Sequence, residues 1–350
     1  SASTVTQALT ITGGTEAVVI TGAISAANTN TIATATNGVV TATITNGAVS
    51  STLAAITAVD VNDVITFTTT DSSVDASDLV DLAAKVDTFT TTSVNTITEA
   101  YNTVALTTEI TDALEIVPNA AVTVTGGSIT TTNANTIDGL TTGVVTASIS
   151  ETDASTLATV TDANGNNDYT ATITTASVDA SVFNGISNVI ANLTDGGVTT
   201  LTETAADFAE VNTALTGGVL NGNEAVTITG DITAVNVSTI LNNTSGVVTA
   251  TISSDTAANL NSNLTNTSGN DALTLTVTNT PTDAADLVAL NGKTNQQINL
   301  SAVTVISGDA SELIDVYVTN IADYSGLGNE AVSVDNTSSA ADVNTIATAT

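Results

Sequence analysis

The chain has 350 residues, with 35 Asp and Glu, two Lys and no Arg, His, Cys, Met or Trp, which gives a formal net charge of -33. Without His or Cys it cannot form Ser-His or Cys-His nucleophile pairs or the usual zinc sites, and its acidity excludes a basic nucleic-acid surface and attraction to an anionic membrane. Apolar residues, mostly small and branched, make up 42% of the chain, which is enough for a continuous core. No apolar run approaches the ~18 residues of a membrane-spanning helix.

Related strand-like phrases mark the starts of successive repeat units, at Glu16, Asn119, Glu224 and Glu330. These starts predict one continuous array: 1–15 as the end of a preceding unit, 16–118, 119–223 and 224–329 as three repeat units, and 330–350 as the start of a further unit. Residues 341–350 closely match residues 27–36. We therefore expect the repeats to continue, either in a longer polypeptide or by end-to-end self-association.

The phrase Gly-Val-Val-Thr-Ala-Thr/Ser-Ile occurs three times, starting at Gly38, Gly143 and Gly246. Its alternation of apolar residues with Thr or Ser is typical of a strand that has one buried and one exposed face. In the first copy we expect Val40, Ala42 and Ile44 to point inward, while the Thr residues between them point outward.

Short segments with helix signals lie between the strands, and residues 283–290 are the clearest. Asp283 occupies the N-cap position, Leu287 and Leu290 follow at helical spacing, and an Asn-Gly pair ends the segment. The same N-cap position is occupied by Asp75 and Asp179. We interpret these Asp residues as caps rather than as the paired acids of a glycosidase, because they recur identically and the chain has little aromatic surface to hold a sugar ring.

The alternation of strand, loop, helical turn and loop predicts the fold. A single unit of this kind cannot bury its own apolar face, whereas stacked units cover one another. The sequence therefore predicts a mainly β protein, a parallel β-solenoid with coils of roughly 25 residues and short helical turns between the strands.

Four phrases point to a known class of proteins: GVVTATIS, DAADLVALNGKT, NANTIDGLTTGVV and GLGNEAV. They resemble the repeats of giant cell-surface and secreted proteins of marine cyanobacteria and related bacteria, which are similar to RTX-like adhesins and surface-layer components. The resemblance covers essentially the whole chain. It implies a protein that is exported and arrayed outside the cell. The calcium-binding nonapeptide GGxGxDxUx of true RTX proteins does not occur in the sequence.

The best candidate metal ligands are four oxygen-bearing side chains that alternate around Gly165, namely Asp162, Asn164, Asn166 and Asp168. Such clustered oxygens suit a hard cation, and the alternation resembles the first half of a calcium loop. The bidentate Glu that completes an EF-hand is missing. A polar Asn-Gly turn between strands explains the same pattern without a metal, so calcium is the only cofactor that the sequence indicates.

Outward Thr-x-Thr pairs recur on the predicted strands and form a candidate ice- or surface-binding face: Thr41, Thr43, Thr66, Thr68, Thr170, Thr172, Thr249, Thr251, Thr274 and Thr276. Flat ranks of such pairs resemble the ice-binding face of some antifreeze proteins. The alternative is that Thr fills exposed strand positions because it is both β-branched and polar.

Taken together, these features predict an extracellular structural protein without catalytic activity, a segment of a filament, fibre or surface layer that is adhesive in some settings. The alternative is an ice- or polysaccharide-binding protein that uses its Thr pairs. The expected partners are further copies or continuations of the same repeats and a surface or polysaccharide, and no nucleic acid or membrane insertion is expected.

Overall fold

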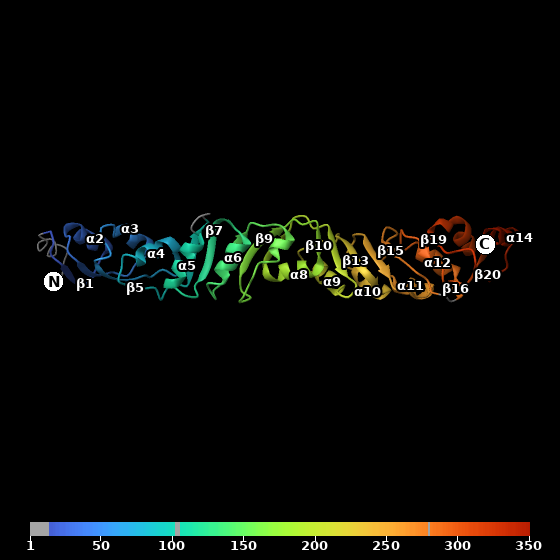
Figure 1. Ribbon diagram of the computed structural model, residues 1–350, viewed down its shortest axis with the longest axis horizontal. Coiled ribbons are helices and arrows are strands. Elements are labelled where there is room, and N and C mark those ends of the chain that lie inside the picture. Colours follow the sequence, from blue (N-terminus) through green and yellow to red (C-terminus); the bar gives the residue numbers. More distant parts are fainter. Residues whose placement is uncertain (1–13, 102–105, 279–280) are drawn as a thin grey trace. The chain divides into compact units, whose positions relative to one another are not determined.

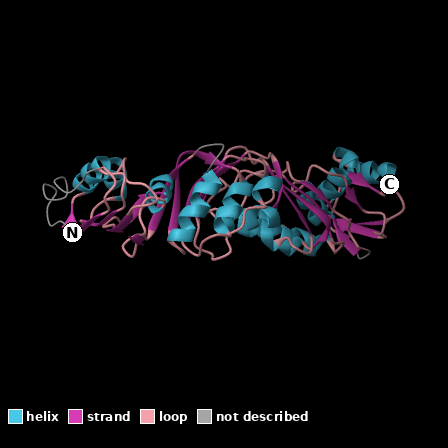
Figure 2. Cartoon of the chain, turned by 60° about the vertical axis from the view of Figure 1, so that its left-hand side comes forward, coloured by secondary structure: helices cyan, strands magenta, loops and turns pink. Residues whose placement is uncertain are grey.

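The computed structural model describes residues 14–101, 106–278 and 281–350. Helices account for 34% of these residues and strands for 29%, and the strands form several separate parallel sheets of two to six strands. The prediction of a mainly β, parallel β-solenoid is therefore wrong, and the protein has a mixed α/β fold. Figure 2 shows helices and strands interspersed along the described chain.

The chain divides into two compact units, which are described separately. The first contains the described residues up to Thr152 together with 159–172 and 188–193, and the second contains 153–158, 173–187 and 194–350. Of the predicted end of a preceding unit at 1–15, residues 1–13 lie outside the described residues. The predicted boundaries between repeat units remain a prediction.

The first unit is labelled in the blue to green part of Figure 1. Its helices are α2 (Ala26–Ala35), α3 (Val49–Ala55), α4 (Ala76–Ala83), α5 (Leu106–Ile116) and α6 (Thr131–Asp138). Its strands are β1 (Val18–Ile24), β2 (Val40–Ile44), β3 (Val64–Thr68), β4 (Ser73–Asp75), β5 (Thr88–Thr90), β6 (Thr96–Ala100), β7 (Ala121–Ile129), β8 (Val145–Ile149), β9 (Asp168–Ile173) and the start of β11 (Asn192–Asp195). They form two sheets, in the orders β1-β2-β3-β5 and β11-β9-β8-β7-β6-β4.

The second unit has a five-stranded sheet β10-β12-β13-β14-β15, a three-stranded sheet β16-β18-β20 and a pair β17-β19. The strands are β10 (Ser177–Asp179), β12 (Thr200–Thr204), β13 (Ala225–Ile232), β14 (Val248–Ile252), β15 (Ala272–Thr274), β16 (Pro281–Asp283), β17 (Ile298–Asn299), β18 (Val305–Gly308), β19 (Tyr324–Ser325) and β20 (Ala331–Val334). The helices are α7 (Ala154–Leu157), α8 (Ala180–Val189), α9 (Ala209–Thr216), α10 (Ala234–Leu241), α11 (Ala257–Asn263), α12 (Ala284–Asn291), α13 (Ala310–Ile314) and α14 (Ala340–Ala349), with a π-helix at Asp315–Thr319 and a 3-10 turn at Ile321–Asp323.

The segments between strands form complete helices because their capping signals are satisfied. The carboxylates of Asp75, Asp179 and Asp283 accept hydrogen bonds from first-turn N–H groups of α4, α8 and α12. The predicted N-caps are confirmed, and α12 ends at the predicted Asn-Gly pair. Helices of seven to eleven residues, about two to three turns, connect many of the strands, where one or two helical turns were expected.

The strands do not form one continuous ladder, because the order of pairing changes within the first unit. Strand β5 follows β4 in the sequence but pairs with β3, whereas β4 pairs with β6 in the next sheet. The ladder between β1 and β2 also shifts register between Val19 and Ala23. These changes divide the strands into short sheets instead of the single sheet that a solenoid requires.

The predicted alternation of strand residues is confirmed where it was most explicit. In β2, the side chains of Val40, Ala42 and Ile44 are buried and Thr43 is exposed. The buried residues are mainly Val, Ile, Leu and Ala, and the rare aromatic rings, such as Phe67, are among the largest fully buried side chains. The sheets thus present Thr-rich faces outward and apolar faces to the helices.

Candidate functional site

Two residues before each Gly-Val-Val strand, a threonine side chain hydrogen-bonds to two backbone segments. One is the glycine that opens the strand, and the other is a residue just before the preceding strand. The hydroxyl of Thr36 donates to the carbonyl of Glu16 over 2.8 Å and accepts the N–H of Gly38 over 2.9 Å. The same two bonds are made by Thr141 and Thr244. A buried hydroxyl with both a donor and an acceptor bond stabilises the crossing of two backbone segments.

The glycine that opens each Gly-Val-Val strand allows this close approach. A Cβ atom on Gly38, Gly143 or Gly246 would lie only 2.3 to 2.5 Å from a backbone carbonyl oxygen of the preceding strand segment. Real Cβ atoms do not approach so closely, so these positions require glycine for contact rather than for backbone flexibility.

A second polar side chain caps the start of each of these strands from the following loop. The Oδ1 atom of Asp63 accepts the N–H of Val40 over 2.7 Å. The equivalent bonds run from Val145 to Asn167 over 2.8 Å and from Val248 to Asp271 over 2.9 Å. The three acceptors are buried, so each satisfies a strand N–H that water cannot reach.

Six carboxyl side chains of the described residues are buried: Asp63, Glu99, Asp138, Glu203, Glu224 and Asp271. In five of them, both oxygens accept hydrogen bonds, mainly from backbone N–H groups and nearby hydroxyls. Both lysines also bond to the backbone, Lys85 to the carbonyl of Val59 and Lys293 to that of Leu264. The buried charges of the chain thus hold its own backbone in place.

Glu99 is the exception among the buried carboxyl groups. Its Oε1 atom accepts the N–H of Ala100 over 3.0 Å, whereas its Oε2 atom has no hydrogen-bond partner among the described residues. Burial raises the pKa of Glu99, and the negative charges of Asp75 and Glu109 raise it further. The equivalent Glu203 uses both oxygens, accepting from Thr204 and from the start of α8.

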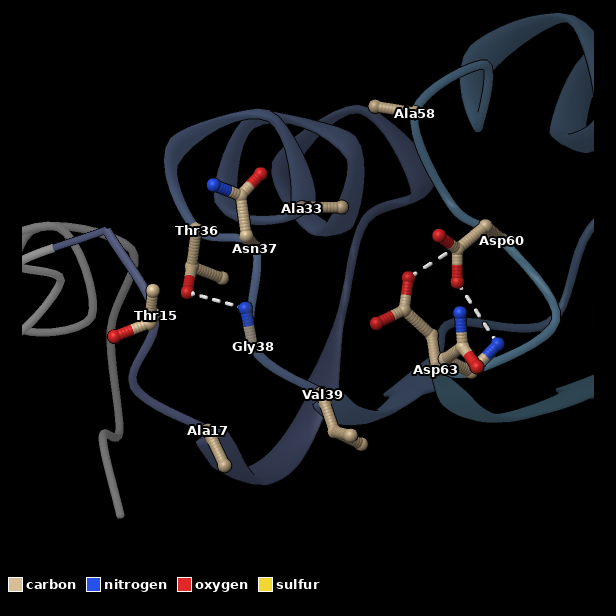
Figure 3. Close-up of a pocket in the computed structure, with 11 residues that line it drawn as sticks. Thr15, Ala17, Ala33, Thr36, Asn37, Gly38, Val39, Ala58, Asp60 and Asp63 are labelled. Carbon is tan, nitrogen blue, oxygen red and sulfur yellow. Dashed lines mark hydrogen bonds between the residues drawn. The ribbon is translucent and has the colours of Figure 1, made fainter.

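A cavity of about 530 Å³ lies between the Thr36–Gly38 crossing and the loop at Asp60 to Asp63. Figure 3 shows Asp60 beside Asp63, across from Thr36 and Gly38. The N–H of Asp60 bonds to Asp63, and the carboxylate of Asp60 accepts the N–H of Asn62. The lining mixes Thr, Asn and Asp side chains with small apolar residues, and it offers no nucleophile paired with a base.

The predicted calcium loop is closed by its own side chains. The carboxylate of Asp162 accepts the N–H groups of Asn166 and Asn167 over 3.1 and 3.2 Å. The amides of Asn164 and Asn166 reach back to the carbonyls of the Thr141-Thr142 pair, and Asp168 accepts the amide of Asn192. The four predicted ligands are thus engaged by protein groups on different sides of the loop, and calcium binding there remains a prediction.

The predicted Thr-x-Thr residues lie on the strand faces away from the helices, although they differ in exposure. Thr43, Thr170, Thr172, Thr249, Thr251 and Thr274 are exposed, whereas Thr41, Thr66, Thr68 and Thr276 are partly covered. Thr residues stand in register on neighbouring strands in rows of three: Thr43, Thr66 and Thr88, then Thr98, Thr123 and Thr146, in the first unit, and Thr202, Thr227 and Thr249 in the second. Of these residues, Thr88, Thr98, Thr146 and Thr202 belong to no predicted Thr-x-Thr pair. Asp75 and Asp168 stand at the two ends of the row that contains Thr98, and Asp179 stands at one end of the row that contains Thr202.

Sequence reasoning did not identify the buried polar groups as a set, although a signal was present. Asp63, Asn167 and Asp271 recur at intervals of 104 residues, as the predicted Asp caps do. They stand in Asn- and Asp-rich loops, where such residues usually indicate an exposed turn. Regular recurrence was the feature that distinguished them.

Comparison of the chain with protein-family models and with curated proteins finds no match. Across the described ranges, no helix has the length and apolar character needed to span a bilayer. Nor do three or more acidic, His or Cys side chains gather in a potential metal site within those ranges.

Proposed function

We propose that this chain belongs to an extracellular structural protein that forms a filament, fibre or surface layer at the cell surface. The observation that supports this proposal most strongly is the use of the buried polar groups. Among the described residues, all six buried carboxylates and both lysines hydrogen-bond within the chain, many of them to its backbone, and five of the six carboxylates use both oxygens.

This use of charge differs from that of a catalytic site. Enzymes that act through carboxylates hold at least one reacting oxygen toward substrate, with its pKa adjusted for proton transfer. Here the buried carboxylate oxygens of the described residues, apart from Oε2 of Glu99, are occupied by groups of the chain itself, as in the bond from Val248 to Asp271. The arrangement favours a role in which rigidity of the backbone is itself the function.

The outer surface fits the same role. A net charge of -33 keeps neighbouring copies from collapsing on one another and attracts divalent cations loosely. With two Lys and no Arg, the chain offers few sites to trypsin-like proteases. Both properties suit a long-lived material outside the cell, including one that adheres to a surface or polysaccharide.

Immunogold labelling of source cells with antibodies raised against the purified chain tests the proposal. We expect label on intact cells, arranged in a continuous layer or along fibres, and its disappearance when the antibody is first absorbed with the chain. Label confined to the cytoplasm of sectioned cells would overturn the proposal.

A second candidate function is the binding of ice or polysaccharide, and the in-register Thr rows favour it. Thr98, Thr123 and Thr146 stand on adjacent parallel strands, so their side chains repeat at about 4.8 Å. Ice recrystallisation and polysaccharide pull-down assays on the purified chain check this function. Substitution of Thr123 by Lys should abolish binding if the row carries it, and an unchanged signal would exclude the row.

A further inference from the structure

The chain contains six Asn-Gly pairs, at 37–38, 46–47, 164–165, 184–185, 221–222 and 291–292. In such a pair, the backbone nitrogen of the glycine can attack the side-chain carbonyl carbon of the Asn, because glycine has no Cβ atom to obstruct the approach. The attack requires that the glycine N–H and the Asn side chain are both released from other contacts. The hydrogen bonds that the fold gives to these two groups therefore decide which pair reacts first.

Three of the pairs hold the glycine N–H in a hydrogen bond. The N–H of Gly38 donates to the hydroxyl of Thr36 over 2.9 Å, as Figure 3 shows. The N–H of Gly222 donates to the carboxylate of Glu224 over 3.0 Å, and that of Gly165 to a backbone carbonyl over 3.2 Å. These bonds must break before the nitrogen can attack.

Two further pairs are held by helices. Asn184 lies within α8, is buried, and donates its side-chain amide to the carbonyl and the carboxylate of Glu210. Asn291 is the last residue of α12, and its side-chain amide donates to Asp323 over 3.0 Å. In both pairs, the side chain must leave its partner and the helix must open locally before the attack can occur.

The pair Asn46-Gly47, in the turn between β2 and α3, is held less firmly. Asn46 is exposed, and its side chain makes no hydrogen bond with any described residue. The N–H of Gly47 reaches the carbonyl of Thr68 only over 3.4 Å, beyond the usual range for such a bond. The long bond belongs to this place in the fold, because the N–H of Asp255, the equivalent residue, also lies 3.4 Å from a carbonyl oxygen.

We propose that Asn46 is a site of spontaneous deamidation, which converts it to Asp or isoaspartate through a cyclic imide. The nitrogen of Gly47 loses its proton to hydroxide and bonds to Cγ of Asn46, and the bond from Cγ to the side-chain nitrogen breaks. That nitrogen takes a proton from water and leaves as ammonia. Water then opens the imide at either carbonyl. The reaction needs only water, so it does not rest on the proposed function.

The equivalent turn between β8 and α7 shows that the fold accepts a carboxylate at this position. Glu151 is the equivalent of Asn46, and it accepts the N–H of Thr131 in the first turn of α6. Position 46 lies close to the start of α2, since Thr45 donates its N–H to Ile24, just before that helix. A negative charge there is favoured by the helix dipole, and the first turn of α2 has no acidic residue of its own. The Asp product should therefore keep the fold.

Incubation of the purified 350-residue chain in heavy-oxygen water at mildly alkaline pH tests the proposal. Each imide that opens takes up an oxygen atom from the solvent, and tandem mass spectrometry after digestion with a Glu-specific protease locates it. We expect residue 46 to take up label at least about fivefold faster than any other Asn-Gly pair, since one ordinary hydrogen bond shifts the open population by about that factor.

Two controls separate the effect of the fold from that of the local sequence. Gly47→Ala keeps the fold, because the added Cβ would lie 3.8 Å from the nearest atom beyond its chain neighbours, but the methyl group obstructs the attack. This variant should slow labelling at residue 46 and leave the other pairs unchanged. In urea, where the hydrogen bonds of the folded chain are lost, all the Asn-Gly pairs should react at similar rates.

Equal or faster labelling at another Asn-Gly pair of the folded chain, or unchanged labelling in Gly47→Ala, would overturn the proposal. The same ratio of rates in urea as in the folded chain would show that the local sequence rather than the fold selects Asn46, and would overturn it as well.

Discussion

The Oδ1 atom of Asp63 accepts the backbone N–H of Val40 over 2.7 Å, across 23 residues of sequence. The other oxygen of the same carboxylate accepts the N–H of Asp60. One side chain therefore fixes both the start of β2 and the loop that leads to β3. Asp271 holds Val248 in the same way. Such a bond is costly to lose because it leaves a buried N–H without a partner.

Substitution of Asp271 by Ala tests this role in the second unit. We expect the free energy of unfolding to fall by about 1–3 kcal/mol, the cost of leaving a buried donor unsatisfied. Urea denaturation followed by circular dichroism measures the change.

Two variants serve as controls for this prediction. Asp271→Asn retains the accepting oxygen, as Asn167 does at the equivalent position, and should cost less than Asp271→Ala. Asp231→Ala removes an exposed carboxylate and should change the free energy by no more than about 0.5 kcal/mol. If Asp271→Ala and Asp231→Ala behave alike, the proposed role of the bond is wrong.

The close approach at Gly246 predicts the effect of adding a single methyl group. Gly246→Ala places a Cβ 2.3 Å from the carbonyl oxygen of Glu224, so the two backbone segments must separate. We expect a loss of about 1–3 kcal/mol in the free energy of unfolding, typical of overpacking. Gly185→Ala is the matched control, since it lies within α8 with no atom within 4 Å of the added Cβ. It should stabilise the protein by about 0.5–1 kcal/mol, and two losses of equal size would contradict the explanation.

Glu99 predicts a pH-dependent contribution to stability. Its pKa is raised in the folded protein, by burial first and then by Asp75 and Glu109. A carboxyl group with a raised folded pKa favours folding when protonated, and this advantage is lost as the pH rises through the folded value. Glu99→Gln should therefore match the wild-type protein at pH values below the ordinary Glu pKa and exceed it in stability at pH 7.

Glu203→Gln is the comparison for this measurement, because Glu203 accepts N–H groups with both oxygens. Gln has only one accepting oxygen, so this variant should be less stable than wild type at pH 7. Melting temperatures recorded from pH 3.5 to 8 check both variants. A stabilising Glu203→Gln, or a Glu99→Gln that is destabilising at pH 7, would contradict the assignment.

Local elements could be predicted from the sequence because their signals are local. The alternation of Val40, Ala42 and Ile44 predicted a strand face, and the Asp75 and Asp283 caps predicted helix starts, as the structure confirms. These features depend on residues within one turn or one strand, where side-chain periodicity and capping decide the conformation.

The pairing of strands could not be predicted in this way. The three-residue strands β4 and β5 carry no signal that tells whether each joins the sheet before or after it, and the structure places β5 beside β3 and β4 beside β6. The assumption that equivalent strands pair in sequence order led to the solenoid prediction. The buried role of Asp271 was missed because an Asp in an Asn-rich loop looks like an exposed turn residue.

The loop around Gly165 predicts how calcium should and should not affect the protein. Its closure relies on Asp162, whose carboxylate accepts the N–H groups of Asn166 and Asn167. Asp162→Ala should therefore speed hydrogen exchange of these two amides whether or not calcium is present. Asn164→Ala removes only a 3.4 Å contact with the carbonyl of Thr141 and should leave the exchange of both amides nearly unchanged.

Because the loop is closed by protein groups, chelation of calcium should not shift the melting temperature of the protein. A clear decrease on chelation would show that a bound ion stabilises the fold.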